Sequence, residues 1–144
     1  MPLPSSALEK FHELSFYTLA HPDKSYFIHQ HIVDAYLAQT ADASTKPIGL
    51  IFALAGLYLF LEKNYSGRQV QLAHMKMAEN KTTWPSVALP EQRGAVTVDD
   101  VLDAAPGIER DALITAWCKS VWEAYQPCHD SISSCVSAAL LINP

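Results

Sequence analysis

The protein has 144 residues, of which 49% are hydrophobic and only 17% carry a charge. This length fits one domain, since domains usually span about 100–200 residues, and the composition allows a sizeable core. Ten Lys and Arg against fifteen Asp and Glu give a net charge of −5, and the basic residues form no run. These figures argue against extensive disorder and against a nucleic-acid or anionic-membrane binder. We expect a single domain over residues 1–144.

No segment predicts secretion or membrane insertion. Residues 1–6 lack the positive and apolar parts of a signal peptide. The longest apolar run, residues 48–61, is shorter than the roughly twenty residues that a spanning helix needs. The three cysteines, Cys118, Cys128 and Cys135, form no CxxC pair. We therefore expect a cytoplasmic protein with free thiols, whose roles the pattern does not indicate.

The first two predicted helices cover residues 6–20 and 24–40. The apolar face of the first comprises Leu8, Phe11, Ser15 and Leu19, with Leu14 and Thr18 beside it. This helix ends before a proline, because the residue that precedes a proline avoids the helical region. The second contains one acid, Asp34, and has apolar residues on all sides. We expect this second helix to be buried on more than one face.

The start of the third predicted helix is marked by Ser44, Thr45 and Pro47, since proline is favoured in a first helical turn, and the helix runs to about residue 63. Its centre is apolar all round, which predicts the central helix of a bundle. Gly49 and Gly56 lie seven residues apart on one stripe, where a neighbouring helix would approach closely. Such packing would offset the roughly 1 kcal/mol that a mid-helix glycine costs.

The remaining sequence also has helical period, interrupted once. Ser66 and Gln69 match a capping box at the start of a fourth helix. Residues 81–96 have no period and form a long loop, which is either a lid or a structural anchor. Further helices are predicted over residues 97–105, 108–126 and 130–141. The fold class is therefore all-α, a compact bundle of six or seven helices with a long internal loop near residues 81–96.

Several motifs together resemble a bacterial family of unknown function. They are His21-Pro22-Asp23, Phe27-Ile28-His29-Gln30, Val33-Asp34-Ala35-Tyr36 with Ala38-Gln39, Gly67-Arg68-Gln69-Val70-Gln71 with His74, Trp84-Pro85, Arg93-Gly94-Ala95-Val96-Thr97-Val98, and Trp117 with Ser120-Val121-Trp122. The resemblance spans about residues 12–125 and implies a small helical protein, but no reaction. The sequence departs from the family pattern at Lys24, where a second proline often stands.

Histidines and acids at helical spacing suggest a metal site. His31 and Asp34 have i, i+3 spacing on the second helix, and His74 on the fourth could complete a His/Asp/His set for one divalent transition metal. A di-iron site is disfavoured, because only one E-x-x-H occurs. The alternative is that these side chains are buried and satisfied by one another or by backbone carbonyls.

Asp34 is the most informative polar residue, since a buried acid is costly unless it is paired or hydrogen-bonded. It either fixes the register of the helices or acts as a ligand or general base in a pocket. A ligand site around it would draw on the second and fourth helices and on the loop as cover. Its candidate residues are His29, Gln30, Asp34, Gln71, Trp84 and Arg93.

Three functions follow from these patterns. The first is a domain that binds a small molecule or a metal between the second and fourth helices. The second is an interaction module, with an exposed apolar helix face that forms a homodimer. The third is a small enzyme that uses Asp34 and a histidine as acid and base. Enzymatic activity is left open, and neither a nucleic acid nor a membrane is an expected partner.

Overall fold

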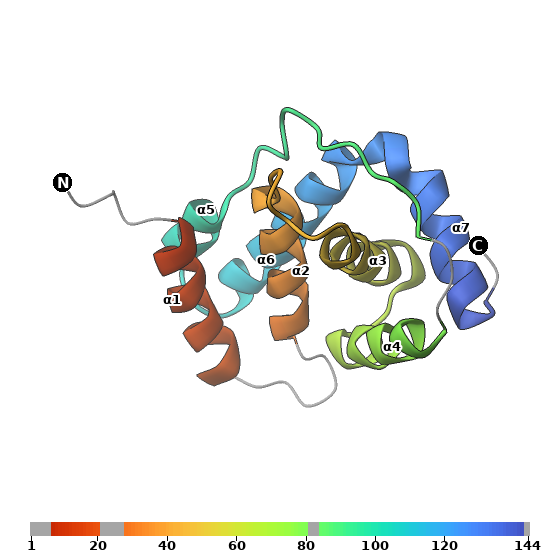
Figure 1. Ribbon diagram of the computed structural model, residues 1–144. Helices are drawn as coiled ribbons and strands as arrows, with labels where there is room; N and C mark the ends of the chain where they lie inside the picture. Colours follow the sequence, from red (N-terminus) through yellow and green to blue (C-terminus); the bar gives the residue numbers. More distant parts are fainter. Residues whose placement is uncertain (1–6, 21–27, 81–83, 143–144) are drawn as a thin grey trace.

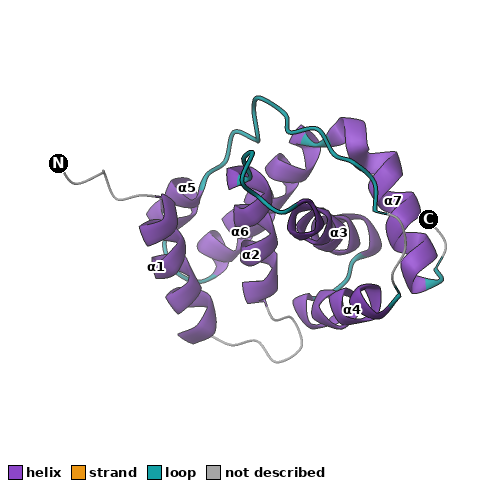
Figure 2. Cartoon of the chain, viewed as in Figure 1, coloured by secondary structure: helices purple, strands orange, loops and turns teal. Residues whose placement is uncertain are grey.

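The computed structural model describes residues 7–20, 28–80 and 84–142. Within these ranges the chain forms seven α-helices and one 3₁₀ turn, and no strand (Figures 1 and 2). They are α1 (Ala7–Ala20), α2 (Ile28–Thr40), α3 (Pro47–Lys63), α4 (Gly67–Glu79), α5 (Val98–Asp103), α6 (Ile108–Ala124), η1 (Gln126–Cys128) and α7 (His129–Leu140). The predicted all-α bundle is confirmed. The expected start of the second helix near residue 24 lies outside the described residues.

Local capping explains where several helices begin. Pro47 occupies the first turn of α3. Ser66 and Gln69 form the predicted capping box of α4, with both reciprocal hydrogen bonds present. Thr97 and Asp100 form a second capping box at α5. Each box satisfies backbone N–H groups that a helix N-terminus would otherwise leave without partners.

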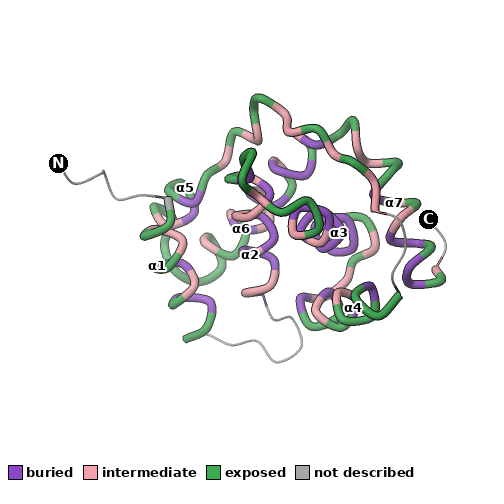
Figure 3. The backbone as a smooth tube through the Cα atoms, viewed as in Figure 1, coloured by how far each residue is buried: buried purple, intermediate pink, exposed green. Residues whose placement is uncertain are grey.

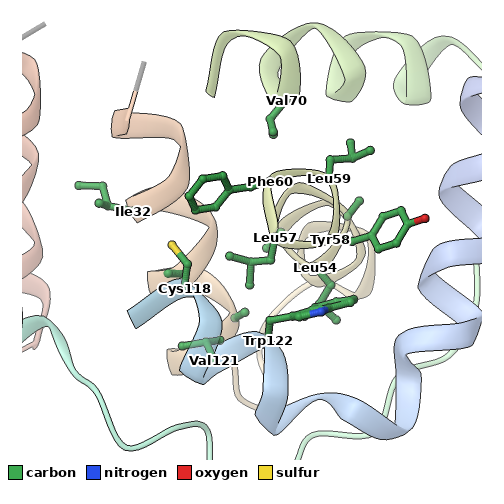
Figure 4. Packing of buried hydrophobic residues seen from close by; sticks show 14 of the residues in the cluster. Ile32, Leu54, Leu57, Tyr58, Leu59, Phe60, Val70, Cys118, Val121 and Trp122 are labelled. Carbon is green, nitrogen blue, oxygen red and sulfur yellow. The ribbon is translucent and has the colours of Figure 1, made fainter. Parts of the chain in front are cut away.

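Helix α3 is the centre of the bundle, as its sequence predicts. It contacts α2, α4, α6 and α7, which surround it in Figure 1. All residues from 53 to 60 are buried, and the tube in Figure 3 shows α3 as the most continuously buried element. In Figure 4, Phe60 extends toward α2, Val70 descends from α4, and Trp122 reaches α3 from α6. Because neighbours surround the middle of α3, residues 53–60 have no solvent-facing side, whereas Ile48 in its first turn is exposed.

Helix α2 is also covered on several sides, because α1, α3, α4 and α6 all contact it. The face predicted for α1 is only partly correct, because Phe11 packs against the core and Thr18 is buried, but the leucines at the two ends are exposed. Leu8 and Leu19 are 50% and 56% exposed, whereas Leu14 and Tyr17 are buried. Helix α1 packs mainly against α2 and α5, and Tyr17 also donates a hydrogen bond to Asp111 of α6, so its buried side follows the line of Leu14 and Tyr17.

The long loop crosses one end of the bundle from the region of α4 and α7 to α5 (Figure 2). All three cysteines are free thiols, as expected. In the described part of the chain, no helix has both the length and the apolar character needed to cross a membrane.

Candidate functional site

Asp34 lies where α2, α3 and α4 meet, and its side chain is almost fully buried. Its Oδ1 accepts a hydrogen bond of 3.1 Å from Nε2 of Gln30, one turn earlier on α2. Its Oδ2 has no hydrogen-bond partner among the described residues. Burial raises the pKa of Asp34 well above its usual value, while the bond from Gln30 lowers the pKa by less. The environment therefore favours the neutral acid.

Gly56 of α3 makes room for this carboxyl group. A Cβ atom at Gly56 would lie 2.0 Å from Oδ2 of Asp34 and 3.2 Å from Val70. The predicted close approach is therefore real at Gly56. At Gly49 the prediction is wrong, because an added Cβ would meet nothing within 4 Å.

The predicted metal set of His31, Asp34 and His74 does not assemble. The ring of His31 stacks on Phe60 with centroids 3.7 Å apart. Nε2 of His74 hydrogen-bonds the carbonyl of Phe52 at 2.7 Å. Among the described residues, no group of three or more His, Cys, Asp or Glu side chains could hold a metal ion. The i, i+3 spacing places His31 beside Asp34 along α2, but α3 and α4 present an aromatic ring, a glycine and a valine there rather than further ligands.

Two of the six predicted ligand-binding residues contact each other, and the other four have separate surroundings. Gln30 pairs with Asp34, His29 Nδ1 lies 2.9 Å from the hydroxyl of Thr18, and Gln71 accepts a 3.3 Å hydrogen bond from Arg68. Trp84 packs edge-on against Phe52. None of the six lines any of the three cavities described below. A ligand site formed by these residues stays a prediction.

Arg93 fastens the long loop to the end of α2. Its guanidinium donates to the carbonyls of Gln39, Ala41 and Pro90, the last at 2.9 Å. In return, Nε2 of Gln39 donates to the carbonyls of Arg93 and Val96. Arg93 forms no salt bridge with a described residue. It binds backbone carbonyls instead, because these are the acceptors at the end of α2.

Gly94 fastens the loop a second time, to α6. Its φ is +104°, and a Cβ there would lie 2.2 Å from Oγ of Ser120. That hydroxyl accepts a 3.2 Å hydrogen bond from the N–H of Val96. Only glycine combines this backbone angle with so close an approach. These contacts favour a structural anchor over a lid as the role of the loop.

The pinned loop forms one wall of a cavity of about 310 Å³, which we call the loop cavity. Its other wall is the corner between α6 and α7. Most of the lining is apolar, with two serine hydroxyls and one thiol as polar groups. It comprises loop residues 86 and 88–90 together with Ala124, Tyr125, Pro127, Cys128 and Ser131. A smaller cavity of about 190 Å³ lies on the α3 side of the loop and shares Ser86 and Leu89.

The corner that forms this cavity is rigid. The hydroxyl of Tyr125 donates a 2.6 Å hydrogen bond to the carbonyl of Ala38. Pro127 lies in η1, which turns the chain from α6 into α7. Burial raises the pKa of the Cys128 thiol to about 11, so this group is a thiol at neutral pH. Sequence reasoning missed the site, although Pro127 and the loop bounds were both visible as breaks in helical period.

A comparison with family models gives one relevant match, to a family of unknown function, DUF5946, over residues 6–126. The chain belongs to the DUF5946 family. The DUF5946 match covers α1 to α6 and the long loop, and ends where η1 begins. Comparisons with curated proteins and with solved structures gave no match. Membership thus agrees with the resemblance to a family of unknown function and assigns no reaction.

Exposed apolar side chains lie on several elements. Phe16 of α1 is 75% exposed, Met75 of α4 is 61% exposed, and Ile108 at the start of α6 is 90% exposed. Formation of a homodimer through such a face stays a prediction.

Proposed function

We propose that this protein is a ligand-binding domain that holds a small, uncharged and largely apolar molecule in the loop cavity. The observation that carries this proposal is an apolar cavity of about 310 Å³ whose covering loop is pinned at both α2 and α6. Small-molecule sites are typically preformed, mostly apolar and roughly 300–1,000 Å³ in volume. A preformed cavity binds without the entropic cost of ordering a loop.

The lining chemistry indicates the kind of ligand. Among the described residues, no charged side chain lines the loop cavity. An ionised group placed there would lose its hydration without gaining a partner charge. The hydroxyls of Ser86 and Ser131 suit one or two hydroxyl or carbonyl groups on the ligand. The raised pKa of Cys128 supports binding rather than nucleophilic catalysis at this site.

Binding of a neutral probe tests the proposal. Cyclohexanol is expected to shift the backbone amide NMR signals of residues 86–89, 125–126 and 128–131, whereas the charged analogue cyclohexylamine is not. Ala124→Phe fills the cavity from α6 and should abolish these shifts. Ala112→Phe, an exposed position on the same helix, is the matched control and should preserve them. An unchanged response in Ala124→Phe, or none in the unmodified protein, would contradict the proposal.

A further inference from the structure

A third cavity, which shares no lining residue with the other two, lies where the ends of α3 and α6 meet the start of α7. Its volume is about 430 Å³. We call it the Trp122 hollow, and it is lined by Leu61, Glu62, Lys119, Trp122, Glu123 and His129. Four of these six side chains are ionisable, in contrast to the uncharged lining of the loop cavity.

Three of the lining side chains hold one another in place. The indole N–H of Trp122 donates a 2.7 Å hydrogen bond to Oε2 of Glu62. The ring of His129 stacks on Trp122, with centroids 3.8 Å apart and planes 8° from parallel. Nε2 of His129 lies 2.8 Å from the carbonyl of Trp122, and since a carbonyl only accepts, Nε2 carries the hydrogen. This part of the wall is therefore preorganised.

The charged groups around this rigid part are unpaired. Glu62, Lys119 and Glu123 are all exposed, and none of them forms an ion pair with any described residue. Glu62 uses only Oε2, toward the indole. Two carboxylates and one ammonium group therefore face a hollow that also offers the side chain of Leu61 and an aromatic pair.

We propose that the Trp122 hollow binds a free basic amino acid, such as arginine. A ligand with two positive groups and one negative group complements two carboxylates and one ammonium group in number and in sign. The α-ammonium and guanidinium groups would pair with Glu62 and Glu123, and the α-carboxylate with Lys119. The aliphatic stem would lie on Leu61 and along the edge of the Trp122–His129 pair.

The first test compares three ligands by NMR at constant ionic strength. L-Arginine should shift the indole Nε1–H signal of Trp122, because that group is bonded to Glu62. Agmatine, which lacks the carboxylate, should bind about tenfold more weakly through loss of the contact to Lys119. L-Glutamate has the opposite charge balance and should give no shift. Equal responses to all three ligands, or none to arginine, would overturn the proposal.

The second test uses variants at exposed positions, which should leave the fold intact. Glu123→Gln should weaken arginine binding about tenfold or more, because it removes one charge-assisted contact. Glu109→Gln, an exposed site near the other end of α6, is the control and should bind like the unmodified protein. Lys119→Gln should abolish the preference for arginine over agmatine. Equal weakening by Glu123→Gln and Glu109→Gln would mean general charge attraction and would refute a defined site.

Discussion

The pair formed by Asp34 and Gly56 shows how one residue depends on another in a different helix. The carboxyl group occupies the space that a side chain at Gly56 would need. It receives one hydrogen bond, from Gln30, and Oδ2 packs against the backbone of α3. A buried polar atom without a partner costs about 1–3 kcal/mol. Asp34 is thus a destabilising group that the surrounding core tolerates.

Alanine substitutions at the two glycines of α3 should have opposite effects. Gly56→Ala forces Cβ against Asp34 and should lower the free energy of unfolding by about 1–3 kcal/mol. Gly49→Ala meets no neighbouring atom and should raise it by about 0.5–1 kcal/mol, because alanine favours the helix. Urea denaturation of both variants measures the difference. Equal effects at the two positions would contradict the packing described for α3.

Among the elements, the long loop depends on a single side chain of α2. Gln39 donates from its amide to two loop carbonyls and accepts a 2.9 Å hydrogen bond from the indole of Trp117 on α6. It therefore ties α2, the loop and α6 together. The wall of the loop cavity is ordered by contacts outside the cavity itself.

Gln39→Ala should loosen the loop while leaving the helices in place. It removes three hydrogen bonds and leaves the Trp117 N–H without a partner, which should cost about 1–3 kcal/mol of stability. The amide of Val96 should exchange its hydrogen faster, and binding of cyclohexanol should weaken. Gln92→Ala, at an exposed loop position, should change neither property. Unaltered exchange at Val96 in Gln39→Ala would show that the loop is held by other contacts.

For the whole molecule, three buried or half-buried histidines and the buried acid make the free energy of unfolding depend on pH in opposite directions. Burial lowers the pKa of His31 to about 4 and also lowers the pKa values of His29 and His74. The unfolded chain then binds more protons than the folded one between about pH 4 and 6.5, so these groups reduce stability as the pH falls. The raised pKa of Asp34 acts in the other direction, since its contribution is largest at low pH and is lost as the pH rises.

Asp34→Asn should therefore make the protein more sensitive to acid. His31 alone contributes a loss of roughly 2 kcal/mol between pH 7 and pH 5. In the unmodified protein Asp34 offsets part of this loss, and the asparagine variant lacks the offset. Urea denaturation at both pH values measures how far the free energy of unfolding falls between them, with the exposed Asp103→Asn as control. If the free energy of unfolding falls no further in Asp34→Asn than in the control, Asp34 does not hold a proton in the folded protein.

Local sequence determined the helices of this protein. Neighbouring residues carry three signals that each correspond to a feature of the fold. These are the capping box at Ser66, the proline at the start of α3 and the loss of helical period after residue 80. The apolar centre of α3 required burial on all sides, because no other arrangement keeps it from water. The single acid of α2 likewise marked Asp34 as the polar exception in the core.

Only the tertiary structure decided what each polar group meets. The spacing of His31 and Asp34 shows that they neighbour each other on α2, but not that Phe60 and Gly56 lie opposite them. Similarly, the loop cavity joins residues near 88 to residues near 127, and the Trp122 hollow joins three helix ends. Helical period determines which residues share a face. Which faces meet depends on how the helices cross, and that follows from packing of the whole core.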